Sequence, residues 1–165
     1  QFERGPQIAA TLAANGFRVS LRSKGELPGP EHQIYIADTL GELGLFYALA
    51  PAAFIAGSLL AHLKGHNPAE AAKLGAAILT GPHVESFEDL YGALFAAKAA
   101  TRASDAGELA AAIAHLWRDG EARRAQIAAA NAVIGQGAAA LAETANRLME
   151  LLSSATQTKV ANALA

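Results

Sequence analysis

The chain has 165 residues, of which 13 are Lys or Arg and 15 are Asp or Glu, and its net charge of −2 argues against a general nucleic-acid binder. The hydrophobic share of 52% excludes intrinsic disorder, and the length suffices for one domain with its own core. Cysteine is absent, which excludes disulfides, thiolate zinc sites and cysteine nucleophiles.

The most apolar stretch, residues 43–63, does not read as a membrane span. Pro51, Gly57 and Ser58 interrupt it, and it contains His62. A spanning helix needs about 20 predominantly apolar residues in a row. Residues 1–18 also lack the basic start and apolar stretch of a signal peptide. We therefore expect the chain itself to be soluble.

The predicted elements alternate between helix and strand. A helix over residues 8–15 precedes an alternating strand at 17–21 and a Gly- and Pro-containing loop at 23–32. Three short apolar runs are typical of strands buried on both faces, at residues 34–37, 53–56 and 76–79. Helices are predicted after them at 40–49, 68–74 and 87–97, and beyond residue 100 we expect only helices, at 108–118, 121–134 and 138–152.

This order predicts an α/β fold with a Rossmann-like parallel sheet flanked by helices. We expect one domain over residues 1–152 and a frayed C-terminal tail over 153–165. Ligands of open parallel sheets bind beyond the carboxyl ends of the strands. The informative segments are therefore the ones that follow the predicted strands, at residues 38–42, 57–59, 65–70 and 81–83.

The segment Gly65-His66-Asn67-Pro68-Ala69-Glu70 reads as the start of a helix. Asn67 suits the N-cap, Pro68 the first helical position, and Glu70 the third position of a capping box. One interpretation is a helix start built for stability, which the spacing alone favours. The other is an anion site, in which free N–H groups and the helix dipole bind a phosphate and Glu70 accepts hydrogen bonds from a ribose diol.

Residues 39–42 repeat this pattern, with Thr39 as the cap and Glu42 at the third position. Gly41 in a first helical turn costs about 1 kcal/mol relative to Ala, which suggests that a side chain there would obstruct something. The same capping pattern also occurs at residues 86–89 and 105–108, so the pattern alone does not identify a binding site.

The five histidines do not form a convincing metal site. His62 and His66 are four residues apart, but Gly65 and Pro68 argue against a continuous helix through both. The chain also lacks a Gly-x-Ser-x-Gly elbow, a Walker A loop and a Gly-x-Gly-x-x-Gly motif. We expect neither a metal nor a cofactor.

Taken together, several segments resemble the C-terminal half of the 3-deoxy-D-manno-octulosonic acid (Kdo) transferases. They occur in family order as Arg22-Ser23, Asp38-Thr39-Leu40-Gly41-Glu42-Leu43, Tyr47, Phe54-Ile55-Ala56-Gly57-Ser58-Leu59, Gly65-His66-Asn67-Pro68-Ala69-Glu70, Gly81-Pro82-His83 and Phe87. The resemblance covers roughly residues 3–152. Each of the five multi-residue strings is weak evidence alone, but all five in family order are specific.

The resemblance implies the donor-binding half of a two-domain (GT-B type) glycosyltransferase. Such an enzyme transfers Kdo from CMP-Kdo to the lipid A precursor at the cytoplasmic face of the bacterial inner membrane. The residues that match the family's donor-binding strings are Leu40, Gly41, Glu42, Gly57, Ser58, His66, Asn67, Pro68, Ala69 and Glu70. By this resemblance the donor is a substrate rather than a cofactor.

The chain departs from the family strings at several positions. Leu40 replaces Met, Ala56 and Lys64 replace Gly, Ala69 replaces Leu, and Ser86 replaces Asn. Of the family's Pro-Arg-His-Pro-Glu-Arg stretch only Glu3-Arg4 is present. The resemblance places the family's Pro-Arg pair, its acceptor domain, its Glu general base and its membrane-associated segment before Gln1. We therefore expect no catalytic residue within these 165 residues and no activity from the chain alone.

Two alternatives stay open. The chain could be the C-terminal domain of another GT-B transferase that uses a UDP or GDP sugar, or a non-catalytic α/β binding domain in which the capped helix starts are only structural. Preference for cytosine over other bases would separate the first alternative from a Kdo transferase. Perturbation by any nucleotide would argue against the second.

Overall fold

The computed structural model describes the backbone of residues 4–163 and the side chains of residues 4–137 and 143–151. Glu3 of the family string and the last two residues of the predicted tail lie outside the described residues. The chain divides into two compact units, residues 1–46 and 47–165, whereas the sequence predicts one domain over residues 1–152. Each unit is described below by itself.

Unit 1 is a small α/β unit. It contains α1 (Gly5–Ala14), β1 (Val19–Leu21), the 3-10 turn η2 (Arg22–Lys24) and β2 (Ile34–Ile36). The two strands pair in parallel, with Val19 opposite Ile34, and α1 packs against β1. Gly16 ends the helix because its φ of 85° lies in the left-handed region that favours glycine. The predicted helix and both predicted strands are confirmed to within a few residues.

Unit 2 is built around a parallel sheet with the order β3-β4-β5. The helix α2 (Leu43–Leu49) crosses the division between the units. The remaining elements, in chain order, are β3 (Ala52–Ile55), η3 (Ala61–Leu63), α3 (Ala69–Lys73), β4 (Ala77–Thr80), η4 (Glu85–Phe87), α4 (Glu88–Ala96), β5 (Ala100–Arg102), α5 (Ala106–Arg118) and α6 (Gly120–Ala163). Parallel pairing throughout confirms the predicted α/β class.

Helices cover both faces of this sheet, which explains the apolar strand sequences. Ile55 and Ile78 pack on one face with Tyr91 and Leu94 of α4 and with residues of α3 and α6. On the other face Leu79 packs with Leu116 of α5. All four residues of β4 are buried because it is the central strand. The segments of unit 2 that are predicted to bind a ligand lie at the edge of the sheet that is formed by the carboxyl ends of these strands.

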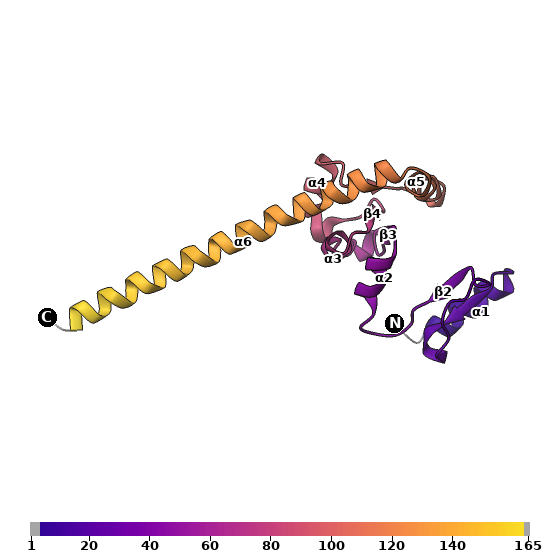
Figure 1. Cartoon of the computed structure of the whole chain (residues 1–165), viewed down its shortest axis with the longest axis horizontal. Coiled ribbons are helices and arrows are strands. Elements are labelled where there is room, and N and C mark those ends of the chain that lie inside the picture. The colour runs from indigo at the N-terminus through magenta and orange to yellow at the C-terminus, as the bar shows by residue number, and fades with distance from the viewer. Residues whose placement is uncertain (1–3, 164–165) are drawn as a thin grey trace. The chain divides into compact units, whose positions relative to one another are not determined.

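Two predictions about the last third of the chain are wrong. The sequence predicts only helices beyond residue 100, but Ala100–Arg102 form the edge strand β5, which is only partly buried and so does not need an apolar run. The predicted helices 121–134 and 138–152 are one helix, α6, which runs from Gly120 through Ala163 (Figure 1). Gly135 and Gly137 do not break it because the flanking alanines have the highest helix propensity.

Candidate functional site

The two strand ends of unit 1 are joined by an ion pair. Arg22, directly after β1, donates through Nε and Nη2 to both carboxylate oxygens of Glu42, at 2.9 to 3.2 Å. Thr39 adds a bond from Oγ1 to Glu42 Oε2 at 2.6 Å. The hydrogen bond from Arg22 is the main reason that the pKa of Glu42 falls to about 2. The pairing brings the Arg22-Ser23 string to the Asp38–Leu43 string.

A second contact joins the same two strings. Ser23 donates its backbone N–H to Asp38 Oδ1 at 2.8 Å and its hydroxyl to Asp38 Oδ2 at 2.7 Å. The hydroxyl bond lowers the pKa of Asp38. Asp38 also approaches the backbone of Gly5, where a Cβ would lie 2.4 Å from Oδ2. A glycine is therefore required at the start of α1.

The predicted helix start at residues 39–42 is corrected by the structure. The helix α2 begins at Leu43, and the carbonyl of Glu42 accepts the N–H of Phe46. Thr39 bonds the Glu42 side chain rather than capping the helix. Gly41 has a φ of 88°, and an added Cβ would meet nothing within 4 Å. Gly41 thus serves the left-handed backbone, and among the described residues no protein atom would be obstructed by a side chain there.

In unit 2 the loops after β3 and β4 are locked together by Ser58. Its hydroxyl donates to the Ile55 carbonyl at 2.6 Å and accepts the Gly81 N–H at 2.8 Å, and Ser58 is fully buried. A Cβ on Gly81 would lie 2.3 Å from the Ser58 carbonyl oxygen. The family resemblance predicts that Ser58 contacts the CMP-Kdo donor. In the structure its side chain instead holds the two loops together.

The loop from Lys64 to Asn67 lies against these same segments. Gly65 donates to the carbonyl of Gly57, and a Cβ on Gly65 would lie 2.8 Å from the His83 carbonyl oxygen. The His66 ring lies against Gly57, where a Cβ would be 2.8 Å from Nε2. Lys64 has a φ of 55°, in the left-handed region. This conformation explains why the family string has glycine where this chain has Lys64.

Asn67 lies just before α3 and is not the predicted N-cap, since the N-cap is Pro68 and makes no side-chain cap bond. Asn67 Oδ1 accepts the Ala69 N–H at 2.9 Å, and Ala69, not Pro68, is the first helical residue. The carboxylate of Glu70 is exposed, and in the described part of the chain it makes no bond back to the Asn67 N–H. Burial and, secondly, the Glu70 charge raise the pKa of Tyr47. Glu70 is thus free of the capping-box bond that the sequence predicts.

A buried tyrosine that the sequence pattern does not single out supports this loop. Tyr91 of α4 is fully buried, and its hydroxyl donates to the His66 carbonyl at 3.1 Å. It fixes the backbone of the loop from inside the core. An aromatic residue in a helical pattern reads as ordinary core packing, so no sequence signal distinguishes this role.

The predicted site residues form one group in each unit. Leu40, Gly41 and Glu42 lie together in unit 1, where Leu40 is 77% exposed. The other seven lie together in unit 2 around the two strand-end loops: Gly57, Ser58, His66, Asn67, Pro68, Ala69 and Glu70. Within the described residues, no group of three His, Cys, Asp or Glu side chains is placed to hold a metal ion. None of the described helices is long and apolar enough to cross a membrane.

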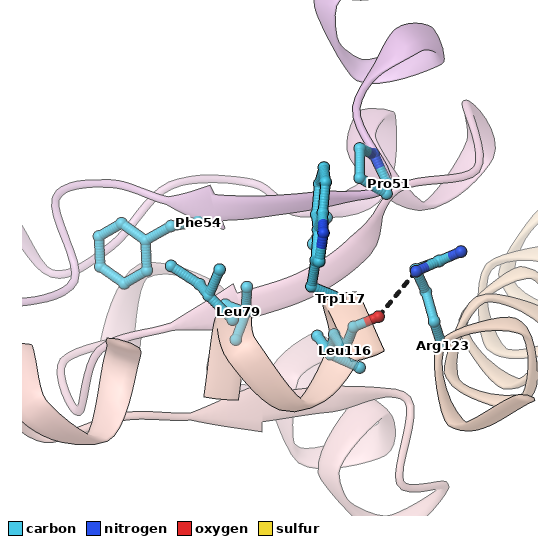
Figure 2. Close-up of a pocket in the computed structure, with 8 residues that line it drawn as sticks. Pro51, Phe54, Leu79, Leu116, Trp117 and Arg123 are labelled. Carbon is cyan, nitrogen blue, oxygen red and sulfur yellow. Dashed lines mark hydrogen bonds between the residues drawn. The ribbon is translucent and has the colours of Figure 1, made fainter. Parts of the chain in front are cut away.

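An apolar hollow of about 150 Å³ opens on the α5 face of the sheet (Figure 2). Pro51, Phe54, Leu79 and Trp117 line it, and Arg123 at its rim donates to the Leu116 carbonyl at 2.8 Å. None of the predicted site residues contributes to this hollow. It is therefore separate from the candidate site.

Comparisons with known proteins agree with the predicted resemblance. No family model matches the chain. It is 46% identical over 91 residues to a protein of Arabidopsis thaliana named probable 3-deoxy-D-manno-octulosonic acid transferase, mitochondrial, and covers 20% of that protein with 54% of its own length. It is 41% identical over 105 residues to the 3-deoxy-D-manno-octulosonic acid transferase of Bordetella pertussis, with 63% of this chain and 24% of the relative covered.

A solved structure is also similar. It is the C-terminal CMP-Kdo binding domain of WaaA from Acinetobacter baumannii, with a TM-score of 0.78, 28% identity, and coverage of 81% of this chain and 69% of that one. The matched part spans about a fifth to a quarter of the length of the two curated relatives. The resemblance to the Kdo transferases and the fold of their C-terminal domain are thereby confirmed.

Proposed function

We propose that this homologue of the Kdo transferases is the donor-binding part of a glycosyltransferase that transfers Kdo from CMP-Kdo. The likeness to a solved CMP-Kdo binding domain over 81% of the chain carries this proposal. The loops that the structure locks together in unit 2 are also the segments that match the family's donor-binding strings. We propose the ten residues named above as the set that binds the CMP-Kdo donor, in which Ser58 and Glu42 act by holding the loops in place.

In unit 2, the start of α3 supplies the phosphate contact. Asn67 Oδ1 already accepts the Ala69 N–H, so the backbone N–H groups that follow Ala69 are the proposed donors to the phosphate. The exposed Glu70 carboxylate accepts hydrogen bonds from the ribose hydroxyls. As the phosphate leaves with CMP, its growing charge is stabilised by these donors.

In unit 1, the hydrogen-bond partners of Glu42 give it a structural role. Both of its oxygens already accept hydrogen bonds, from Arg22 and Thr39. Glu42 therefore acts chiefly by holding the strand-end loop in place, and the backbone of Leu40 and Gly41 presents the donor contact. The open space beside Gly41 allows a ligand to approach that backbone closely.

For the whole enzyme, we propose the lipid A precursor as acceptor and the cytoplasmic face of the bacterial inner membrane as the location. A carboxylate of an N-terminal acceptor domain deprotonates the attacking hydroxyl, and closure of the two domains excludes water. The reaction as proposed needs no metal and no cofactor. The family resemblance supports these features, and under this proposal the 165 residues alone bind donor weakly and catalyse nothing.

The test is an amide NMR titration of this chain with CMP, with UMP and AMP as controls. We expect shifts centred on Gly41, Asn67 and Glu70 with CMP alone. Equal shifts with UMP would favour a transferase that uses a UDP sugar, and no shifts at millimolar CMP would contradict donor binding by this chain.

A matched pair of variants makes the titration specific. Replacing Glu70 by Gln should weaken CMP binding about ten-fold, because a hydrogen bond to a charged group is lost. The control is Glu121→Gln, which removes another carboxylate from a first helical turn outside the candidate site. Equal losses in both variants would mean that only overall charge matters.

A further inference from the structure

A second pocket opens at the carboxyl ends of β4 and β5, and the site described above does not use its charged side chains. We call it the Arg102 pocket. Its volume is about 270 Å³, and it is lined by Pro82 and Val84 after β4, by Glu88, Tyr91 and Phe95 of α4, and by Arg102 at the end of β5. Ligands of open parallel sheets bind at this edge.

The guanidinium of Arg102 is stacked rather than ion-paired. Its Cζ lies 4.3 Å from the centroid of the Phe95 ring. Among the residues whose side chains the structure describes, no carboxylate forms a salt bridge with it. Stacking occupies a face of the planar group and leaves the N–H donors at its edge available. Such an edge binds a carboxylate through two parallel hydrogen bonds.

The pocket also contains two carboxyl groups, Glu85 and Glu88. Glu85 Oε1 lies 3.5 Å from His83 Nδ1. Its own backbone N–H, and then His83 and Lys64, lower the pKa of Glu85, so it is ionised at neutral pH. An ionised carboxylate is a strong acceptor for hydroxyl groups. The pocket therefore suits a ligand that has both a negative group for Arg102 and several hydroxyls.

The pocket shares its walls with the proposed donor loop. Tyr91, which lines the pocket, donates its hydroxyl to the His66 carbonyl at 3.1 Å. Val84, another lining residue, lies so close to Gly65 that a Cβ there would be 3.1 Å from the Val84 Cα. The pocket and the loop that begins at Gly65 therefore share the walls made by Tyr91 and Val84.

We propose that the Arg102 pocket binds the sugar-acid part of the donor, with Arg102 taking the carboxylate and Glu85 and Glu88 accepting hydrogen bonds from the hydroxyls. This inference rests on the proposed function, since it concerns the same donor. A neutral sugar leaves Arg102 without its partner, and a simple anion without hydroxyls gains nothing from the two glutamates. The pocket thereby selects an acidic, polyhydroxylated sugar.

The experiment compares the affinities of this chain for CMP and for CMP-Kdo by calorimetry or NMR titration. Arg102→Gln should weaken CMP-Kdo binding about ten-fold, since one charged pair is lost, and leave CMP binding within about two-fold. Glu88→Gln should likewise weaken CMP-Kdo selectively. The control is Arg118→Gln, because Arg118 is an exposed arginine at the end of α5 outside the pocket.

Each outcome decides the matter. Equal affinities of the unaltered chain for CMP and CMP-Kdo would overturn the inference, because the sugar then adds no binding. Equal losses for the two ligands in Arg102→Gln, or no loss for either, would overturn it as well. Unchanged CMP binding in each variant shows that the fold is intact. Failure of the unaltered chain to bind CMP at all would instead contradict the proposed function on which this inference rests.

Discussion

The two units build their strand-end segments in different ways. In unit 1, charged side chains join the segments: Arg22 pairs with Glu42, whose side chains are 33% and 29% exposed, and Ser23 pairs with Asp38. In unit 2, the join is made by backbone groups and the buried hydroxyl of Ser58. The side-chain contacts of unit 1 are thus partly exposed to solvent, whereas the Ser58 contacts of unit 2 are buried.

This difference determines how substitutions affect each unit. A side-chain ion pair near the surface gives a well-defined geometry at a modest gain in stability, because water screens the charges. Closely packed backbone leaves no room for an added atom, and a buried unpaired N–H is costly. We therefore expect substitutions in the unit 2 loops to act on stability and those in unit 1 to act mainly on the local geometry.

The largest effect is expected at Gly81. In Gly81→Ala the new Cβ would lie 2.3 Å from the Ser58 carbonyl oxygen, so the backbone of both loops must move. We expect a loss of about 3 kcal/mol in the free energy of unfolding, measured with urea. Gly135→Ala in α6, where a Cβ meets nothing within 4 Å, is the control and should be neutral or slightly stabilising. A loss below that seen for an ordinary surface change would contradict the close packing.

Ser58→Ala should have the next largest effect. It removes the acceptor of the buried Gly81 N–H and the donor to the Ile55 carbonyl. We expect a loss of about 2 kcal/mol in unfolding free energy, because a buried donor is left without a partner. Ser86→Ala serves as the exposed control in the same unit. Similar losses in the two variants would show that the hydroxyl does not join the loops.

Lys64→Gly tests the backbone strain in the unit 2 loop. Lys64 has a φ of 55° and Lys98 a φ of 54°, and glycine adopts such angles without steric cost. Each change to glycine should raise the unfolding free energy by up to about 1 kcal/mol. Lys73→Gly, in α3, should lower it by about 1 kcal/mol instead. A fall in stability in all three variants would mean that the side chains of Lys64 and Lys98 matter more than their backbone angles.

The smallest effect is expected from the ion pair of unit 1, and it depends on pH. The pKa of Glu42 is lowered from 4.5 to about 2, so its contribution is present above pH 4.5 and is lost as the pH falls toward 2. The difference in thermal stability between the unaltered chain and Glu42→Gln should therefore shrink over this range. A difference that stays constant from pH 6 to pH 2.5 would show that the carboxylate charge plays no part.

Much of this arrangement is visible in the sequence. The apolar runs of β3 and β4 are local patterns, and burial on both faces of the sheet dictates them. The pairing of Arg22 with Glu42, 20 residues apart, is not a local pattern, and neither is the contact of Tyr91 with His66. Both depend on which strand ends and helices meet in the fold.

The sequence by itself determined the α/β class, most of the helices and strands, and the segments that resemble the Kdo transferases. Each of these features depends on residues that are close together along the chain. Only the tertiary structure decided that Glu42 is held by an arginine, that Gly81 is required by the Ser58 carbonyl, and that Arg102 stacks on Phe95 beside two glutamates. It also decided that Ala100–Arg102 pair as an edge strand and that α6 runs through its glycines. Contacts between distant segments are set by packing, and packing is not encoded at any single position.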